Sequence, residues 1–118
     1  MTPLETVQAC QCACAVHDWP ALRRLLDDRL QFAGPMMKTG SADEFVAAMQ
    51  NFHCQFENRI HRVLKSDDGW VASLLDCIFL QPFQATVRMS EWVLVRDGRI
   101  RELNLIFDSK QMPQMPPA

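Results

Sequence analysis

Residues 95–108 read VRDGRIRELNLIFD, and this stretch decides the fold. The Asp97-Gly98 pair near its start is typical of a two-residue type I′ turn, so it predicts a tight antiparallel hairpin. Working outward from this hairpin, we expect four consecutive strands that are rich in branched and aromatic residues: Ile60–Leu64, Trp70–Leu80, Thr86–Val95 and Ile100–Phe107.

Turn signals separate these four strands. Ser66-Asp-Asp-Gly69 follows the first strand, and Pro82 lies at the centre of the corner after the second. Hairpins between successive strands make the predicted sheet antiparallel.

The first half of the chain has helical periodicity. An apolar stripe, marked by Leu4, Val7, Cys10 and Cys14, predicts a helix from Pro3 to about His17. A second, short helix is expected from the Asp18 N-cap to about Asp28, with Leu22, Leu25 and Leu26 on its buried face.

A short strand and a third helix complete the predicted order. The strand is expected at Leu30–Ala33, before Gly34-Pro35. Ser41 and Glu44 form a capping box at the start of the third helix, whose apolar face carries Phe45, Val46, Met49 and Phe52. The prediction is an α+β fold in which a cone-shaped, curved antiparallel sheet wraps around three N-terminal helices.

The length and composition of the chain predict one small domain. The chain has 118 residues, with residues 1–110 expected to form the domain and the proline-rich residues 111–118 a loose tail. Its net charge of -2 argues against a nucleic-acid partner. No apolar run is long enough for a membrane span and the five cysteines are unsuited to a disulfide framework, so we expect a cytoplasmic protein with reduced thiols.

The hairpin turn also predicts which side chains face inward. If Arg96 pairs with Arg99, strict alternation places Arg88, Ser90 and Trp92 on the inner face with Leu103, Leu105 and Phe107. With Trp19 and Phe32, the uncharged members of this set are expected to line an apolar, ligand-sized pocket: Trp19, Phe32, Ser90, Trp92, Leu103, Leu105 and Phe107.

Asp76 and Arg88 are the predicted catalytic pair. A corner near Pro82 brings them opposite each other, and inside the cone they could act as proton carrier and oxyanion anchor. The alternative is a structural ion pair between two strands, which is the commoner outcome.

Three further groups have a functional and a structural interpretation. Cys10, Cys14 and His17 could present soft metal ligands on one helical face, but they also extend the apolar stripe, and we expect core packing, no metal and no cofactor. His53 and His61 could serve as a general base at a pocket mouth or lie at the surface.

The other face of the sheet predicts a homodimer. On the same register it gathers an apolar set that a monomer would expose: Val71, Leu75, Cys77, Val87, Met89, Val93 and Ile106.

The order of motifs resembles the nuclear-transport-factor-2-like superfamily, in particular its SnoaL-like branch with its cystatin-like cone. The motifs are HDWPAL at 17–22, FAGP at 32–35, SADEF at 41–45 and the Asp-Gly hairpin that closes on Phe107-Asp108. The resemblance implies a pocket, frequent homodimers, and activities such as those of ketosteroid isomerase-like, epoxide hydrolase-like and polyketide cyclase-like enzymes. The chain departs from that pattern because it has no tyrosine, and the last strand's catalytic aspartate falls on Leu105, which leaves Asp76 as the match for the other carboxylate.

Three functions remain open from the sequence. The leading hypothesis is a homodimeric protein that binds a small apolar or aromatic metabolite, with weak acid/base chemistry. The second is an isomerase or lyase of polyketide-cyclase type. The third is a non-catalytic accessory subunit whose interior is packed solid.

Overall fold

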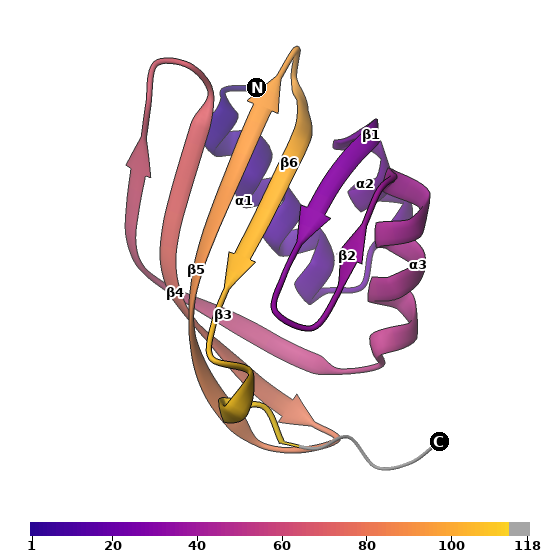
Figure 1. Cartoon of the computed structure of the whole chain (residues 1–118), viewed down its shortest axis with the longest axis vertical. Helices are drawn as coiled ribbons and strands as arrows, with labels where there is room; N and C mark the ends of the chain where they lie inside the picture. The colour runs from indigo at the N-terminus through magenta and orange to yellow at the C-terminus, as the bar shows by residue number, and fades with distance from the viewer. Residues whose placement is uncertain (114–118) are drawn as a thin grey trace.

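The computed structural model describes residues 1–113 and combines three α-helices with one six-stranded sheet (Figure 1). The helices are α1 (Pro3–Ala15), α2 (Trp19–Arg24) and α3 (Ala42–Phe52). The strands are β1 (Leu26–Ala33), β2 (Lys38–Thr39), β3 (Gln55–Lys65), β4 (Trp70–Gln81), β5 (Ala85–Arg96) and β6 (Arg99–Ile106), followed by the 3-10 helix η1 (Ser109–Gln111).

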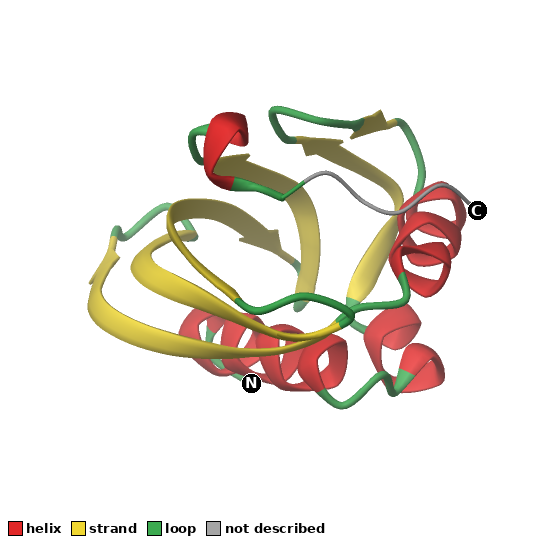
Figure 2. Cartoon of the chain, turned by 90° about the horizontal axis from the view of Figure 1, so that it is seen from below, coloured by secondary structure: helices red, strands yellow, loops and turns green. Residues whose placement is uncertain are grey.

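The strand order is β2-β1-β6-β5-β4-β3. All neighbours are antiparallel except β1 and β6, which run parallel. Figure 2 shows how strongly the strands curve, with the helices gathered along one side of the sheet. The predicted α+β fold with a curved sheet and three helices is confirmed.

The helix ends follow local chemistry. Thr2 and Glu5 form a reciprocal capping box at the start of α1, and the Ser41 hydroxyl accepts a hydrogen bond from the Glu44 amide at the start of α3. The helix α1 ends at Ala15 rather than near His17, because His17 has a left-handed backbone with φ 60°.

The second helix is shorter than predicted. It ends at Arg24, and Leu26 begins strand β1, so the prediction of a helix to about Asp28 is wrong. Leu26 and Leu30 are fully buried, and Leu26 pairs with Ile100 of β6. That partner lies more than 70 residues away in the sequence, so local spacing could not reveal it.

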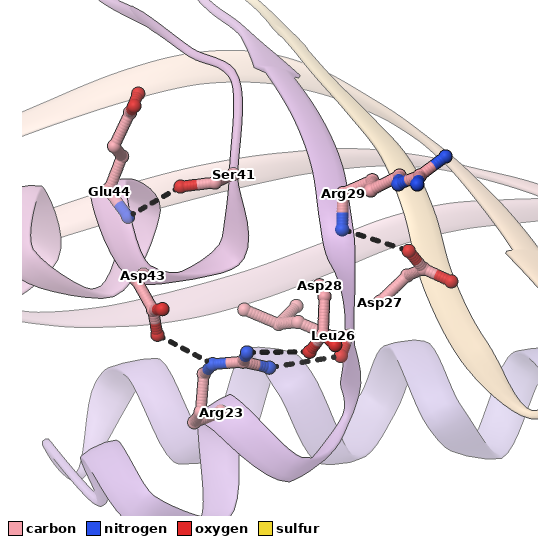
Figure 3. A network of polar contacts seen from close by, with 8 residues as sticks. All are labelled: Arg23, Leu26, Asp27, Asp28, Arg29, Ser41, Asp43 and Glu44. Carbon is pink, nitrogen blue, oxygen red and sulfur yellow. Dashed lines mark hydrogen bonds and ion pairs between the residues drawn. The ribbon is translucent and has the colours of Figure 1, made fainter.

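Arg23 links the end of α2 to its neighbours (Figure 3). Its guanidinium contacts Asp28 of β1 at 2.7 Å and Asp43 of α3 at 2.9 Å, and it donates to the Leu26 carbonyl at 3.3 Å. These carboxylates are exposed, so the contacts orient the three elements more than they stabilise them.

A bulge in β6 changes the predicted register. Arg96 pairs with Arg99 as expected, with Asp97 and Gly98 both at positive φ, but the pairing shifts so that Leu94 lies opposite Glu102. The extra residue, Arg101, lets the buried side chains of Ile100 and Leu103 point to the same side although they are three positions apart. The prediction that Trp92 faces Leu103 is therefore wrong, since its partner is Asn104.

Candidate functional site

A cavity of about 210 Å³ lies between the helices and the helix-facing side of the sheet. Helices α1 and α3 form one wall and strands β3 to β6 form the other. Phe32 of β1, the β1–β2 loop, Phe107 and Met112 complete the lining. The lining includes six phenylalanines, five methionines and three cysteines. Among the described residues that line it, Gln11, Asn58 and Glu91 alone carry polar side chains other than thiols.

Glu91 is the carboxyl group of this cavity. It projects from β5 on the same side as Met89 and Val93, and its Oε1 accepts a hydrogen bond of 2.9 Å from Gln11 Nε2 of α1. Burial raises the pKa of Glu91, because the charged form loses water, while the Gln11 hydrogen bond partly opposes that shift. A carboxyl group whose pKa is raised in an apolar cavity is a candidate for holding and transferring a proton.

Strict alternation from the hairpin turn places Glu91 on the outer face, so the sequence register did not identify it as a cavity residue. The alternation of β5 nevertheless carries a sign of the position of Glu91. Four residues share its parity in this strand and all are buried, namely Val87, Met89, Val93 and Val95. Glu91 is thus a charged residue within an apolar alternation, a pattern that marks a functional candidate.

Two of the cavity thiols, Cys10 and Cys77, resist ionisation. The neighbouring Cys14 and burial raise the pKa of Cys10, and burial raises the pKa of Cys77 to about 12. They contribute small, polarisable surface rather than nucleophiles.

The predicted pocket residues divide into two groups. Phe32, Leu103, Leu105 and Phe107 line the cavity. The predicted inward position of Ser90 and Trp92 is wrong, because both lie on the outer face, where Trp92 is 44% exposed and donates a hydrogen bond to Ser90. Trp19 packs beside the core and stacks on His17, away from the cavity lining.

Asp76 and Arg88 are opposite each other, as predicted, but outside the cone. They are register partners, and Arg88 Nε lies 2.7 Å from Asp76 Oδ1. Their outward position corrects the prediction, because Leu75 and Cys77 occupy the helix-facing side of β4. A catalytic role for this pair stays a prediction that its place outside the cavity does not support.

His61 joins this pair on the outer face. Its Nε2 lies 2.7 Å from Asp76 Oδ2, so one carboxylate contacts both groups. The hydrogen bond from Arg88, which has the larger effect, and the contact with His61 lower the pKa of Asp76 below its ordinary value. The arrangement fits the structural ion pair that the sequence left open.

The other predicted histidine positions are separate from the cavity. His17 Nε2 lies 3.0 Å from the Cys54 carbonyl oxygen, and His53 is an exposed left-handed residue at the end of α3. His17 therefore does not share a helical face with the buried Cys10 and Cys14. Within residues 1–113 no three His, Cys, Asp or Glu side chains are arranged to hold a metal ion.

The outer face of the sheet carries a different apolar set from the one predicted. Six of the seven predicted residues are buried on the helix-facing side, namely Val71, Leu75, Cys77, Val87, Met89 and Val93. The exposed apolar residues of the outer face include Leu64, Leu74, Trp92 and Ile106, and we call these four, one from each of β3 to β6, the outer patch.

Met112 lines the cavity although the predicted domain ended at 110, and residues 114–118 of the predicted tail lie outside the described residues. In the part that the structure describes, no helix has the length and apolarity to cross a membrane.

Comparison with solved structures identifies the architecture. An NTF2-like protein of unknown function from Cytophaga hutchinsonii is 20% identical, with a TM-score of 0.81 and 93% of each chain covered. The chain has the NTF2-like fold. The predicted resemblance to this superfamily is thereby confirmed for the architecture.

Other proteins with the NTF2-like fold differ in their described activities. An LEH-like epoxide hydrolase from M. tuberculosis has a TM-score of 0.83 at 20% identity, covering 93% of this chain and 85% of that one. A protein from Shewanella denitrificans described as a SnoaL-like polyketide cyclase has a TM-score of 0.85 at 13% identity, with 92% of each chain covered. No family model and no curated protein matches the sequence. At these identities the likeness concerns the fold, and activity must be argued from the site.

Proposed function

We propose that the protein binds a small, largely apolar or aromatic metabolite in the 210 Å³ cavity and exchanges a proton with it at Glu91. One observation carries the proposal: a single carboxyl group, held by Gln11, lies in a wall of phenylalanine, methionine and leucine side chains. Apolar walls favour an apolar ligand, and a few polar groups orient it. Because burial raises its pKa, Glu91 can donate a proton or accept one.

The methionines provide a direct test of binding. Five of the seven, at positions 36, 37, 49, 89 and 112, line the cavity, whereas Met1 is exposed at the N-terminus. With ¹³C-methyl methionine labelling, a panel of small aromatic compounds should shift the cavity methyl signals and leave Met1 unchanged. Shifts of Met1 alone, or of no methyl signal at millimolar concentration, would contradict the proposal.

A polyketide-cyclase-type isomerase or lyase is the second candidate, favoured by the acid/base group in an apolar cavity. The assay is hydrogen–deuterium exchange at the α-carbon of 2-tetralone, followed by NMR in D₂O. If Glu91 acts as base and then as acid, Glu91→Gln should slow the catalysed exchange by about 10²–10⁴-fold. Equal exchange by the wild type and Glu91→Gln would exclude Glu91 from this chemistry.

The cavity also bears on the third hypothesis, an accessory subunit with a solid interior. A void lined by Glu91 and Gln11 supports the binding proposal over that hypothesis, because a purely structural core rarely keeps an acid without an ionic partner.

We further propose that the protein forms a homodimer through the outer patch. Trp92 is 44% exposed and Ile106 59% exposed, and exposed apolar residues from four adjacent strands suit a self-complementary interface. Sedimentation at micromolar concentration should give a dimer, and Trp92→Glu should give a monomer. Val16→Glu, which changes an exposed apolar residue at the end of α1, is the control. A wild-type monomer at the same concentration would overturn this proposal.

A further inference from the structure

The charge around the cavity restricts what can occupy it. Glu91 is the one carboxyl group among the lining residues, and within residues 1–113 no lysine, arginine or histidine lines the cavity. An anionic ligand would therefore meet no positive partner and would be repelled when Glu91 is ionised. The lining thus disfavours carboxylate and phosphate ligands.

The second oxygen of Glu91 has no partner in the protein. Gln11 Nε2 donates to Oε1, and none of the described residues donates a hydrogen bond to Oε2. An isolated carboxylate in apolar surroundings is unfavourable, so a group that supplies positive charge at Oε2 recovers the cost of ionising it. The counter-charge that the protein lacks there is one that a ligand can bring.

The rest of the lining also favours a cation. Phenylalanine rings present a negative face to a nearby ammonium group, and Phe32, Phe56 and Phe107 are among the six in the lining. The sulfur atoms of Met49, Met89 and the cavity cysteines are polarisable, and methionine surfaces adapt to ligands of different shape.

From these features we infer that the ligand is an aromatic or alicyclic amine whose ammonium group pairs with Glu91. The inference rests on the proposed function, since it names the class of molecule that the same cavity binds. The amine enters as the ammonium cation and pairs with the Glu91 carboxylate at Oε2; below the folded pKa of Glu91, the O–H bond breaks on binding and its proton passes to the solvent. The apolar part of the ligand then packs on the phenylalanine and methionine side chains.

Three probes of the same shape test the charge preference: 2-phenylethylamine, 2-phenylethanol and phenylacetate. Binding to the wild type is measured at pH 7 from the shifts of the cavity methionine methyl groups. The amine should bind at least tenfold more tightly than the alcohol, a difference of about 1.4 kcal/mol, and phenylacetate should bind most weakly. At a pH below the folded pKa of Glu91, calorimetry in buffers of different ionisation enthalpy should detect proton release on amine binding.

Glu91→Gln is the decisive variant, because the amide keeps the shape and can still accept from Gln11. It should remove the tenfold preference for the amine and leave alcohol binding within twofold of the wild type. Glu57→Gln, on the exposed side of β3, is the matched control and should change neither.

The outcomes separate the two proposals. If the alcohol binds as tightly as the amine, or if the amine preference persists in Glu91→Gln, the inference about amines is wrong while the cavity still binds small molecules. If none of the three probes shifts a cavity methyl signal, the binding proposal itself fails.

Discussion

Replacing Glu91 by glutamine should change how the stability of the protein depends on pH. The half-buried Glu91 carboxyl group has a raised pKa in the folded state, whereas in the unfolded chain it titrates near the ordinary glutamate value of about 4.3. Between these two pKa values the folded state holds one proton more than the unfolded state. The stability that this proton confers is fully present below about pH 4.3 and is lost as the pH rises through the folded pKa.

The magnitude of this pH dependence follows from a difference of one bound proton between the folded and unfolded states. Within that window the free energy of unfolding of the wild type should fall by up to about 1.4 kcal/mol per pH unit relative to Glu91→Gln, and above the folded pKa the difference should become constant. The substituted amide mimics the protonated acid, so Glu91→Gln should be the more stable protein at the upper end of the range. Gln11→Leu removes a hydrogen bond that lowers the pKa of Glu91, so it should extend the window to higher pH.

The assay is urea unfolding at fixed protein concentration, followed by tryptophan fluorescence, at half-unit intervals from pH 4 to pH 8. Glu57→Gln controls for the loss of one negative charge from an exposed position on the same sheet. A stability difference between the wild type and Glu91→Gln that stays flat over this range would refute the reasoning, because it would mean that Glu91 is as well hydrated in the folded state as in the unfolded chain.

Three further changes test the fold. Leu26→Ala truncates a fully buried side chain in β1 and should lower the free energy of unfolding by about 2–5 kcal/mol, measured by urea denaturation; a loss below about 1 kcal/mol would mean that Leu26 is not in the core. Ser41→Ala removes the N-cap of α3 and should cost about 1 kcal/mol, with Ser41→Asp as the variant that restores it in the same assay. Asp76→Asn should destabilise the protein at neutral pH, because Arg88 and His61 stabilise the wild-type carboxylate. The stability difference between the wild type and Asp76→Asn should disappear as the pH falls through the lowered pKa of Asp76. A stability difference that persists in acid would contradict the ion-pair interpretation.

The local part of the fold could be predicted from the sequence because its causes are local. Asp97-Gly98 specifies a turn whose two residues both have positive φ, and Ser41 with Glu44 specifies the start of α3. The corner near Pro82 places Asp76 opposite Arg88 by symmetry about the turn, as the structure has it.

The side of the sheet that each residue faces depends on strand pairing rather than on local sequence. One inserted residue, Arg101, moves the pairing of β5 with β6 by one position, and a shift of one exchanges the two faces of a strand. Beyond the bulge, Leu103 and Leu105 of β6 lie opposite Val93 and Glu91. The apolar side of β6 therefore joins the side of β5 that carries Glu91, and Arg88, Ser90 and Trp92 lie outside.

What the sequence by itself determined is thus the set of turns, caps and apolar periods that lead to an NTF2-like fold. Tertiary structure decided the bulge, the parallel pairing of β1 with β6 and the identity of the buried acid. The reason is energetic: a bulge costs little locally and is selected by how many distant apolar side chains, such as Leu26 and Ile100, it allows into one core.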